Sequence, residues 1–220
     1  MDIDIKLETI EGKLCATGEN FSPIFVDFES SKIVNRIKQG KKKNPVVQAL
    51  GLNKHKGNII DTTAGFGIDS FIASAFGANV FLIERSTIMF QLLEDGLLRA
   101  KHSPINIIKD AANRMQLTHA NSISTLPQLV KDILPISIYI DPMYPERKKS
   151  ALGKANLRAI SLFIGKDEDS IELLDIAKKH CKRTVVKRPK LAPTLSNEKP
   201  DFVIPGKSTR FDVYLNNEII

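Results

Sequence analysis

The sequence predicts an α/β fold with one mainly parallel sheet covered by helices. From residue 44 onward, short strand-like apolar segments alternate with segments of helical periodicity, which is typical of parallel strands joined by crossover helices. Glycines at positions 65 and 67 lie in a turn between one such strand and the next helix. The stretch DFVIPGKSTRFDVYL places Pro205-Gly206-Lys207 between two β-prone runs, which predicts an antiparallel C-terminal edge.

Length and composition limit the number of domains. The chain has 220 residues, of which 42% are apolar and 26% charged, as in ordinary globular proteins. A single substantial core therefore accounts for most of the chain. We expect a small N-terminal extension at residues 1–43 and the α/β domain at residues 44–220.

The N-terminal extension is expected to contain short strands. Alternating apolar residues at Ile3, Ile5 and Leu7 predict the first strand, and Ile24–Phe28 predicts the second. A polar and basic stretch follows and ends at Lys43.

The α/β domain begins with a short helix from Pro45 to Leu50, which Gly51 ends. The expected strands follow in order, the third with the weakest pattern: Asn58–Asp61, Val80–Glu84, Gln116–His119, Ile136–Asp141 and Thr184–Lys187. Helical periodicity predicts helices in the intervening segments, at Asp69–Phe76, Thr87–Lys101, Leu126–Lys131 and Ser170–His180.

The charge balance is basic. The formal net charge is +7, and basic residues gather at Lys41–Lys43, at Arg147–Lys149 and around Lys187-Arg188. An excess of positive charge indicates an anionic partner such as nucleic acid. A single lysine run can equally be a solvated surface, so the runs gain weight only from the motifs beside them.

Several classes of protein are disfavoured by what the sequence lacks. Cys15 and Cys181 are the only cysteines, and neither has a His or Cys at the short spacing of a zinc site or a disulfide framework. The four histidines are scattered without a paired nucleophile. The N-terminus has no secretion signal, and no apolar run approaches about 18 residues. We therefore expect a cytoplasmic protein without a metal and without a membrane partner.

The turn in IIDTTAGFGIDSF has features of a nucleotide-cofactor site. Asp61 ends a strand, and Gly65 and Gly67 allow the backbone to approach a ligand closely. Glu84 ends the next strand, where a carboxylate can accept hydrogen bonds from both hydroxyls of a ribose. The dinucleotide pattern Gly-x-Gly-x-x-Gly fits poorly in either alignment: Ser70 replaces its third glycine if Gly65 is the first, and Thr63 replaces its first glycine if Gly65 is the second.

The segment IYIDPMYPERKKSA combines an acidic strand end with a stiff turn. Asp141 would face the same cleft as Gly65 and Glu84, since ligands of parallel sheets lie at the carboxyl ends of the strands. Pro142 and Pro145 remove two N–H donors and leave carbonyl acceptors. A carboxylate and a carbonyl suit the two donors of an exocyclic amine, and Tyr144 offers a ring on which a base can stack.

The chain resembles a known family at this point. Asp-Pro-Met-Tyr is similar to the [D/N/S]-P-P-[Y/F/W] signature of amino-methyltransferases, with Met143 in place of the second proline. Six segments, taken in order along the chain, look like those of the ribosomal RNA small subunit methyltransferase J family. They are FVDF, DTTAGFGIDSF, LIERS, IDPMYPERKKSA, VVKRP and RFDVYL.

The resemblance implies a Rossmann-like domain that uses S-adenosylmethionine to methylate the exocyclic 2-amino group of a guanosine in small-subunit ribosomal RNA. It also implies cofactor contacts at these positions, beyond Asp61, Gly65 and Gly67 of the turn: Ile68, Asp69, Glu84, Arg85, Asn121, Ser122 and Asp141. Ile68 and Asn121 depart from the family, whose members carry Arg and Ser there. Only a backbone contact at Ile68 would survive that change.

The reaction would depend mainly on alignment of donor and acceptor, with Asp141, Pro142 and Tyr144 as the catalytic group. The expected partner is small-subunit ribosomal RNA, free or in the assembled subunit. Basic residues near the motifs are expected to contact its phosphates: Arg147, Lys148, Lys149, Lys187, Arg188 and Arg210.

Three alternatives remain open at the level of sequence. The Asp-Pro-x-aromatic logic does not distinguish guanine from adenine, so an adenine-amino methyltransferase of DNA or RNA is possible. An NAD-binding oxidoreductase is disfavoured by Thr63 and Ser70. A non-enzymatic RNA-binding protein is disfavoured by the presence of Asp61, Glu84 and Asp141 together.

Overall fold

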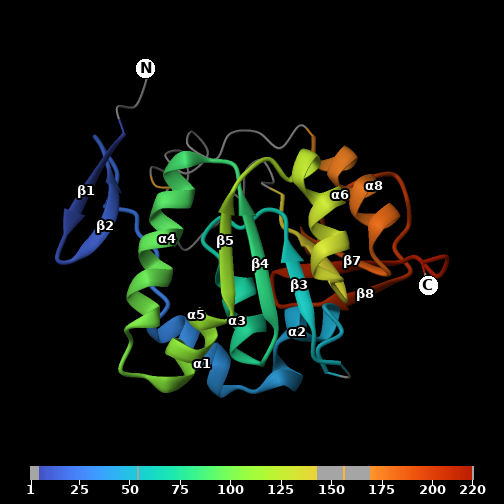
Figure 1. Ribbon diagram of the computed structural model, residues 1–220, viewed down its shortest axis with the longest axis horizontal. Helices are drawn as coiled ribbons and strands as arrows, with labels where there is room; N and C mark the ends of the chain where they lie inside the picture. The colour runs from blue at the N-terminus through green and yellow to red at the C-terminus, as the bar shows by residue number, and fades with distance from the viewer. Residues whose placement is uncertain (1–4, 54, 143–155, 157–168, 220) are drawn as a thin grey trace.

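A twisted sheet of seven strands forms the centre of the computed structural model (Figure 1), which describes residues 5–53, 55–142, 156 and 169–219. The strand order is β5-β4-β3-β6-β7-β9-β8. The bounds are β3 Asn58–Asp61, β4 Asn79–Glu84, β5 Met115–His119, β6 Ser137–Ile140, β7 Arg183–Pro189, β8 Phe202–Pro205 and β9 Thr209–Leu215.

The direction of the strands confirms the predicted mixed sheet. Strands β5, β4, β3, β6 and β7 pair in parallel, and β9 is antiparallel to both β7 and β8. The chain order reverses between β3 and β6, because β3 leads to β4 on one side while β6 lies on its other side. Ligands of open α/β sheets bind at such a switch point, outside the carboxyl ends of the strands.

Helices cover both faces of the sheet (Figure 1). One face packs against α1 (Ser31–Lys38), α2 (Pro45–Ala49), α3 (Ile68–Ala75), α4 (Thr87–Lys101) and α5 (Asn106–Asn113). The other face packs against α6 (Ser122–Ile133) and α8 (Ser170–His180). Each face has its own cluster of buried apolar side chains, so the sheet is the middle of three layers.

In the α/β domain, one helix is longer than predicted and another was not predicted. The predicted helix Leu126–Lys131 is longer, because Asn121 accepts a hydrogen bond from the Ile123 N–H and so caps an extra turn. Pro127 inside it obscured that turn in the sequence. The helix α5 was not predicted, since its buried face consists largely of small residues, Ala111 and Ala112 beside Ile108.

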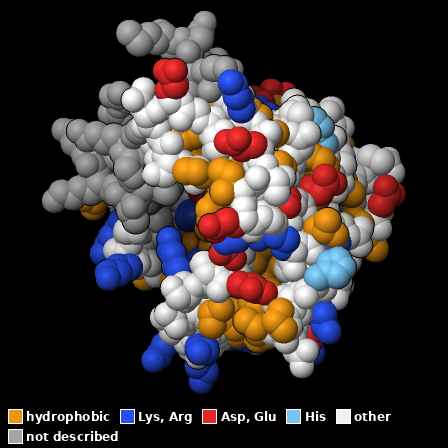
Figure 2. All heavy atoms as spheres, turned by 90° about the vertical axis from the view of Figure 1, so that its left-hand side faces the viewer, with side chains coloured by type: hydrophobic (Ala, Val, Ile, Leu, Met, Phe, Trp, Pro, Cys, Tyr) orange, Lys and Arg blue, Asp and Glu red, His pale blue; other side chains and the backbone are white. Residues whose placement is uncertain are grey.

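The first strand predicted in the N-terminal segment is found only in part, since Leu7 lies in a strand, Ile5 precedes it and Ile3 lies outside the described residues. The strand that pairs with it was not predicted. The hairpin of β1 (Lys6–Ile10) and β2 (Lys13–Thr17) lies beside α4 (Figure 1), on the side of the molecule where Figure 2 shows acidic and basic side chains intermixed. Ile24–Phe28 is not a strand: only Ile24 bridges to Ala16. The apolar residues of this stretch enter the core instead, and the Phe28 ring stacks on Phe71 with ring centres 4.1 Å apart. The polar stretch after it forms α1.

A domain boundary at residue 43 stays a prediction. The buried side chains of Val26, Phe28 and Ile33 belong to the same apolar cluster as those of α3 and α4. The Asp95 carboxylate of α4 accepts the Leu14 N–H over 3.2 Å, and the Arg99 guanidinium donates to the Val26 carbonyl. The N-terminal segment is thus packed onto the α/β domain.

Candidate active site

A cavity of about 250 Å³ opens at the carboxyl ends of β3, β4 and β6. Its walls come from the loop between β3 and α3, the end of β4, the first turn of α6, β7 and the start of α8. All residues expected to contact a cofactor line it: Asp61, Gly65, Gly67, Ile68, Asp69, Glu84, Arg85, Asn121, Ser122 and Asp141. The strand ends therefore bring these distant positions together, as the parallel sheet predicted.

The loop after β3 requires its glycines. Gly65 and Gly67 have φ values of +51° and +65°, a region that favours glycine. A Cβ atom at Gly67 would also lie 2.9 Å from a methyl group of Leu93. The loop can therefore pass close to α4 and leave its backbone facing the cavity.

Glu84 is fixed by the same loop. One carboxylate oxygen accepts the Gly65 N–H over 2.8 Å, and the other accepts the Ser86 N–H over 2.8 Å. Each carboxylate oxygen has two lone pairs, so these bonds orient the group without exhausting its capacity to accept. The carboxylate predicted to bind a ribose is thus held on the cavity wall.

Asp61 lies at the base of the cavity and is buried. Burial raises the pKa of its carboxyl to about 7, although hydrogen bonds from the Ser70 hydroxyl and the Thr63 N–H oppose that rise. The neighbouring carboxylates of Asp141 and Asp69 add to the rise. Asp61 therefore exchanges a proton near neutral pH.

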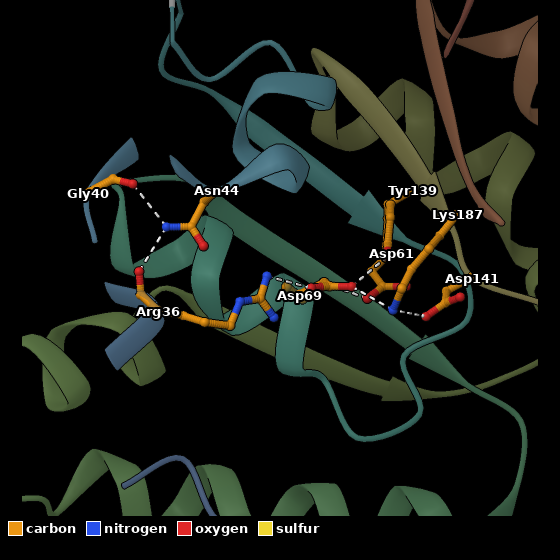
Figure 3. A network of polar contacts seen from close by, with 9 residues as sticks. Arg36, Gly40, Asn44, Asp61, Asp69, Tyr139, Asp141 and Lys187 are labelled. Carbon is orange, nitrogen blue, oxygen red and sulfur yellow. Dashed lines mark hydrogen bonds and ion pairs between the residues drawn. The ribbon is translucent and has the colours of Figure 1, made fainter. Parts of the chain in front are cut away.

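An alternating chain of charges lies beside Asp61 (Figure 3). The Lys187 ammonium is 2.8 Å from a carboxylate oxygen of Asp69 and 2.8 Å from one of Asp141. The other oxygen of Asp69 pairs with the Arg36 guanidinium at 2.9 Å, and the Tyr139 hydroxyl donates to Asp69 over 2.9 Å. Four elements, α1, α3, β6 and β7, thus converge on one charged network.

The network fixes the charge of its members. Burial alone would raise the pKa of Asp69, but Lys187 and Arg36 outweigh it and hold that pKa well below its usual range. Burial alone would lower the pKa of Lys187, yet Asp141 and Asp69 raise it above its usual value. Burial and the nearby carboxylates raise the pKa of Tyr139, so its hydroxyl stays a donor.

The Asp-Pro turn joins this network. The Asp141 N–H donates to the Thr63 hydroxyl over 2.7 Å, and Pro142 is buried. The Asp141 side chain is about one-third exposed and reaches the cavity, where Lys187 pairs with it. Tyr144, Arg147, Lys148 and Lys149 lie outside the described residues.

The predicted phosphate contacts on β7 and β9 need correction. Lys187 lies in the cavity between the carboxylates of Asp69 and Asp141 and not on a surface that could bind phosphates. Arg188 is 5% exposed and donates to the Pro193 carbonyl. Arg210 pairs with the buried Asp212 and donates to the carbonyls of Pro189 and Ala192. Consecutive side chains of a strand point to opposite faces, so Lys187 faces away from Arg188. Arg188 and its register partner Arg210 lie on the other face, where both hold the loop after β7.

Sequence reasoning missed several residues of the site. Arg36, Tyr139 and Asp169 line the cavity or contact its carboxylates. The Asp169 carboxylate, just before α8, pairs with the Arg85 guanidinium at 2.7 Å. Arg36 belongs to a basic stretch that looked like surface in the sequence. Tyr139 lies in an apolar strand, where its polar hydroxyl between Ile138 and Ile140 was a signal of a role in the site.

The described lining of the cavity has an excess of negative charge. Its cations are Arg85 and Lys187, and its carboxyl groups are Asp61, Asp69, Glu84, Asp141 and Asp169. Such a lining favours a ligand that carries positive charge. It disfavours the pyrophosphate of NAD, whereas the sulfonium and ammonium groups of S-adenosylmethionine suit it.

The fold and the cavity together define the class of protein. A mostly parallel sheet has a glycine turn after β3, an acidic residue at the end of β4 and an Asp-Pro turn after β6, all on one cavity. This arrangement is that of a Rossmann-like methyltransferase. In agreement, residues 3–216 match the family described as "Putative SAM-dependent methyltransferase".

Named relatives narrow the class. A ribosomal RNA small subunit methyltransferase J from Nitrosococcus oceani is 42% identical over 202 residues, covering 89% of this chain and 78% of that protein. The protein of the same name from Colwellia psychrerythraea is 39% identical over 212 residues, covering 94% and 76%. The chain belongs to the ribosomal RNA small subunit methyltransferase J family, and its cofactor is S-adenosylmethionine.

A solved structure supports this assignment. The crystal structure of a SAM-dependent methyltransferase from Neisseria gonorrhoeae superimposes with a TM-score of 0.79 at 30% identity, covering 100% of this chain and 86% of that one. Among the described residues no helix is long and apolar enough to cross a membrane. The same residues contain no group of three or more His, Cys, Asp or Glu side chains that could hold a metal ion.

Proposed function

We propose that the protein transfers a methyl group to the exocyclic 2-amino group of a guanosine in small-subunit ribosomal RNA. The observation that carries the proposal is the position of Asp141. Its carboxylate follows β6 beside a buried proline and faces the same cavity as the glycine loop and Glu84. An acceptor for an amine thus lies next to the place where the cofactor binds.

The chain's own residues suit the parts of S-adenosylmethionine. Glu84 is oriented to accept from the ribose hydroxyls, and Ile83, Ile123 and Leu173 give the cavity apolar surface for the base. The backbone of the glycine loop lines the side between Asp61 and α3. Ile68 also lines the cavity, so this departure from the family's Arg is compatible with a backbone contact.

When bound, the cofactor supplies an electrophilic methyl group on a positively charged sulfur. The guanine amine is a weak nucleophile, because its lone pair is delocalised into the ring. The Asp141 carboxylate and the Pro142 carbonyl can accept hydrogen bonds from the two N–H groups of the amine and hold the amine in line for attack. The new N–C bond would form as the methyl–sulfur bond breaks, with neutral S-adenosylhomocysteine as the leaving group. The Asp141 carboxylate stabilises the positive charge that grows on the amine nitrogen, and the amine then loses one proton to the carboxylate or to water.

The substrate base must reach the cavity unstacked. Tyr144, which follows the Asp-Pro turn, is the proposed stacking surface, and Arg147, Lys148 and Lys149 are the proposed contacts to flanking phosphates. Relatives at about 40% identity carry small-subunit ribosomal RNA in their names, which supports this substrate. A ribosomal RNA substrate in turn supports a location in the cytoplasm.

The experiment combines cofactor titration with methyl transfer. Purified protein is titrated calorimetrically with S-adenosylmethionine, then incubated with the radiolabelled cofactor and small ribosomal subunits that lack native modification. Nuclease digestion of the labelled RNA is expected to yield N2-methylguanosine. Label on adenine would support the adenine-amino alternative, and binding without any transfer to RNA would contradict the proposed substrate.

Free RNA is compared with the assembled subunit under the same conditions. The comparison decides which form the enzyme recognises, since an exposed guanosine in the subunit is presented in a fixed shape whereas free RNA must be unstacked first. Transfer to both at equal rates would show that the protein reads only the local sequence.

A further inference from the structure

We infer that Lys187 is a positioning residue for methyl transfer, whose ammonium group holds the Asp141 carboxylate toward the acceptor amine. The inference rests on the proposed function, because it gives Asp141 its role. It assigns to Lys187 a task other than contact with RNA phosphates. The geometry in Figure 3 points to it, since Lys187 extends from β7 between the two carboxylates.

Lys187 is bound by its neighbours on two sides. Its ammonium lies 2.8 Å from the Asp141 carboxylate and 2.8 Å from the Asp69 carboxylate. Asp69 is itself held by Arg36 from α1 and by the Tyr139 hydroxyl from β6. The lysine therefore has a rigid anchor on its Asp69 side and transmits that rigidity to Asp141.

Asp141 is the most exposed member of the network. It follows the last residue of β6 and its side chain is 37% exposed, more than any other member of the network for which the structure gives a value. Its backbone is fixed by the bond to Thr63, but a carboxylate can still rotate about its side-chain bonds. The pair with Lys187 selects one orientation, in which the carboxylate faces the cavity.

The cavity also contains competing negative charge. Asp61, Asp69 and Asp141 line the same space, and without Lys187 their mutual repulsion would favour turning Asp141 outward to water. The other cation that contacts this cluster, Arg36, pairs with the far oxygen of Asp69. Lys187 is thus the bridge between Asp69 and Asp141 in the described network.

An orienting role predicts a specific kinetic signature. Loss of the ammonium should affect binding of S-adenosylmethionine less than it affects transfer, because Glu84 and the glycine loop keep their contacts although Asp69 and Asp141 lose a cation. It should lower kcat by about 10- to 100-fold, since displacement of a reacting partner by about 1 Å has effects of this size. The loss of kcat should be absent when Asp141 has already been replaced.

The experiment is a double-mutant cycle measured as single-turnover methyl transfer to unmodified small subunits. It compares the wild type with Lys187→Met, Lys187→Arg, Asp141→Asn and the double variant Lys187→Met/Asp141→Asn. The matched control is Lys182→Met, at an exposed lysine just before β7, which should transfer at the wild-type rate. Calorimetry with S-adenosylmethionine and thermal unfolding accompany each variant.

The expected result is loss of transfer in Lys187→Met, partial recovery in Lys187→Arg, and a double variant no slower than Asp141→Asn alone. A further tenfold loss in the double variant would overturn the inference, since Lys187 would then act without Asp141. If Lys187→Met fails to fold, Asp141→Asn and the double variant still decide it, because the double variant carries no charge at position 141 and Asp69 keeps its pair with Arg36. If Lys187→Met turns over at the wild-type rate while Asp141→Asn is impaired, only the role of Lys187 is refuted. If Asp141→Asn turns over at the wild-type rate, the proposed mechanism itself is refuted.

Discussion

The Asp141 N–H donates a 2.7 Å hydrogen bond to the hydroxyl oxygen of Thr63. Thr63 belongs to the glycine loop after β3, and Asp141 begins the Asp-Pro turn after β6. The bond therefore joins the segment that faces the cofactor to the segment proposed to hold the acceptor amine. In the alignment that makes Gly65 the second glycine of a dinucleotide fingerprint, position 63 would be a glycine, which lacks this acceptor.

Replacement of Thr63 by Val should weaken this link. The side chain keeps its shape but loses the acceptor, which leaves the Asp141 N–H without that bond in a partly buried place. We expect a loss of about 1 to 3 kcal/mol in the free energy of unfolding and about a tenfold loss of methyl transfer. Thr63→Ser keeps the hydroxyl and serves as the control. Equal transfer rates for Val and Ser would show that the bond has no part in catalysis.

The protonation of Asp61 should make stability depend on pH. Burial raises the pKa of its carboxyl from 3.8 to about 7 in the folded protein. Between those values the folded protein holds a proton that the unfolded chain releases, so the free energy of unfolding falls as pH rises through this window and levels off above it. Asp69, with a lowered pKa, is ionised in both states above about pH 5 and adds almost no slope there.

Urea unfolding from pH 5 to pH 8 measures this dependence. The Asp61→Asn variant has a similar shape and no carboxyl to ionise, so the difference between wild type and variant isolates Asp61. The wild type should lose about 2 kcal/mol relative to the variant over this range. Parallel curves for the two proteins would mean that Asp61 stays ionised throughout.

A glycine in α4 should prove essential for packing of the N-terminal segment. A Cβ atom at Gly96 would lie 2.6 Å from a methyl carbon of Val26 and 3.3 Å from its carbonyl oxygen. Gly96→Ala should therefore destabilise the protein by about 1 to 3 kcal/mol, although alanine is the better helix former by about 1 kcal/mol. In a Val26→Gly background, which removes both the methyl carbon and the Val26 Cβ atom that lies 2.7 Å away, the same change should cost much less, as chemical denaturation can measure. An unchanged cost would place the strain elsewhere.

The sequence was sufficient for the parts of the fold that have a strong periodic signal. The strands β3, β4 and β6 are nearly continuous apolar runs, as buried parallel strands require, and α4 and α8 have the predicted bounds. The strand prediction for Ile24–Phe28 is wrong, although apolar residues alternate there as in a half-buried strand. Val26 and Phe28 are buried by contact with α4 and α3 rather than by pairing, and periodicity does not distinguish those two causes.

The site was predicted to the extent that it follows the strand ends. Asp61, Glu84 and Asp141 each end or follow a parallel strand, so the topology alone brings them to one edge. The charged network escaped prediction because its members come from elements far apart in the chain. Arg36 and Lys187 belong to runs that look like solvated surface, and only the packing of α1 and β7 turns them inward.

Two basic runs allow a matched test of RNA contact. Lys148 and Lys149 follow the Asp-Pro turn, outside the described residues, whereas Lys42 and Lys43 are exposed in the short turn before α2. Asn44 stabilises that turn by donating to the carbonyls of Arg36 and Gly40 over 2.8 and 2.9 Å, so substitution at its exposed lysines should leave the fold intact. The two pairs differ in their distance along the chain from the proposed catalytic group, but not in the charge they carry.

Charge reversal of Lys148 and Lys149 to Glu should weaken binding of small-subunit RNA and reduce its dependence on salt. Loss of two phosphate contacts lowers the slope of log affinity against log salt by roughly 1.5 to 2, because fewer counterions are released on binding. Lys42→Glu/Lys43→Glu changes the net charge equally and should leave that slope nearly unchanged if only the run beside Asp141 touches RNA. Filter binding at several salt concentrations separates a local contact from a general effect of net charge. Equal slopes for the two double variants would contradict a local contact and attribute RNA affinity to the overall positive charge of the chain.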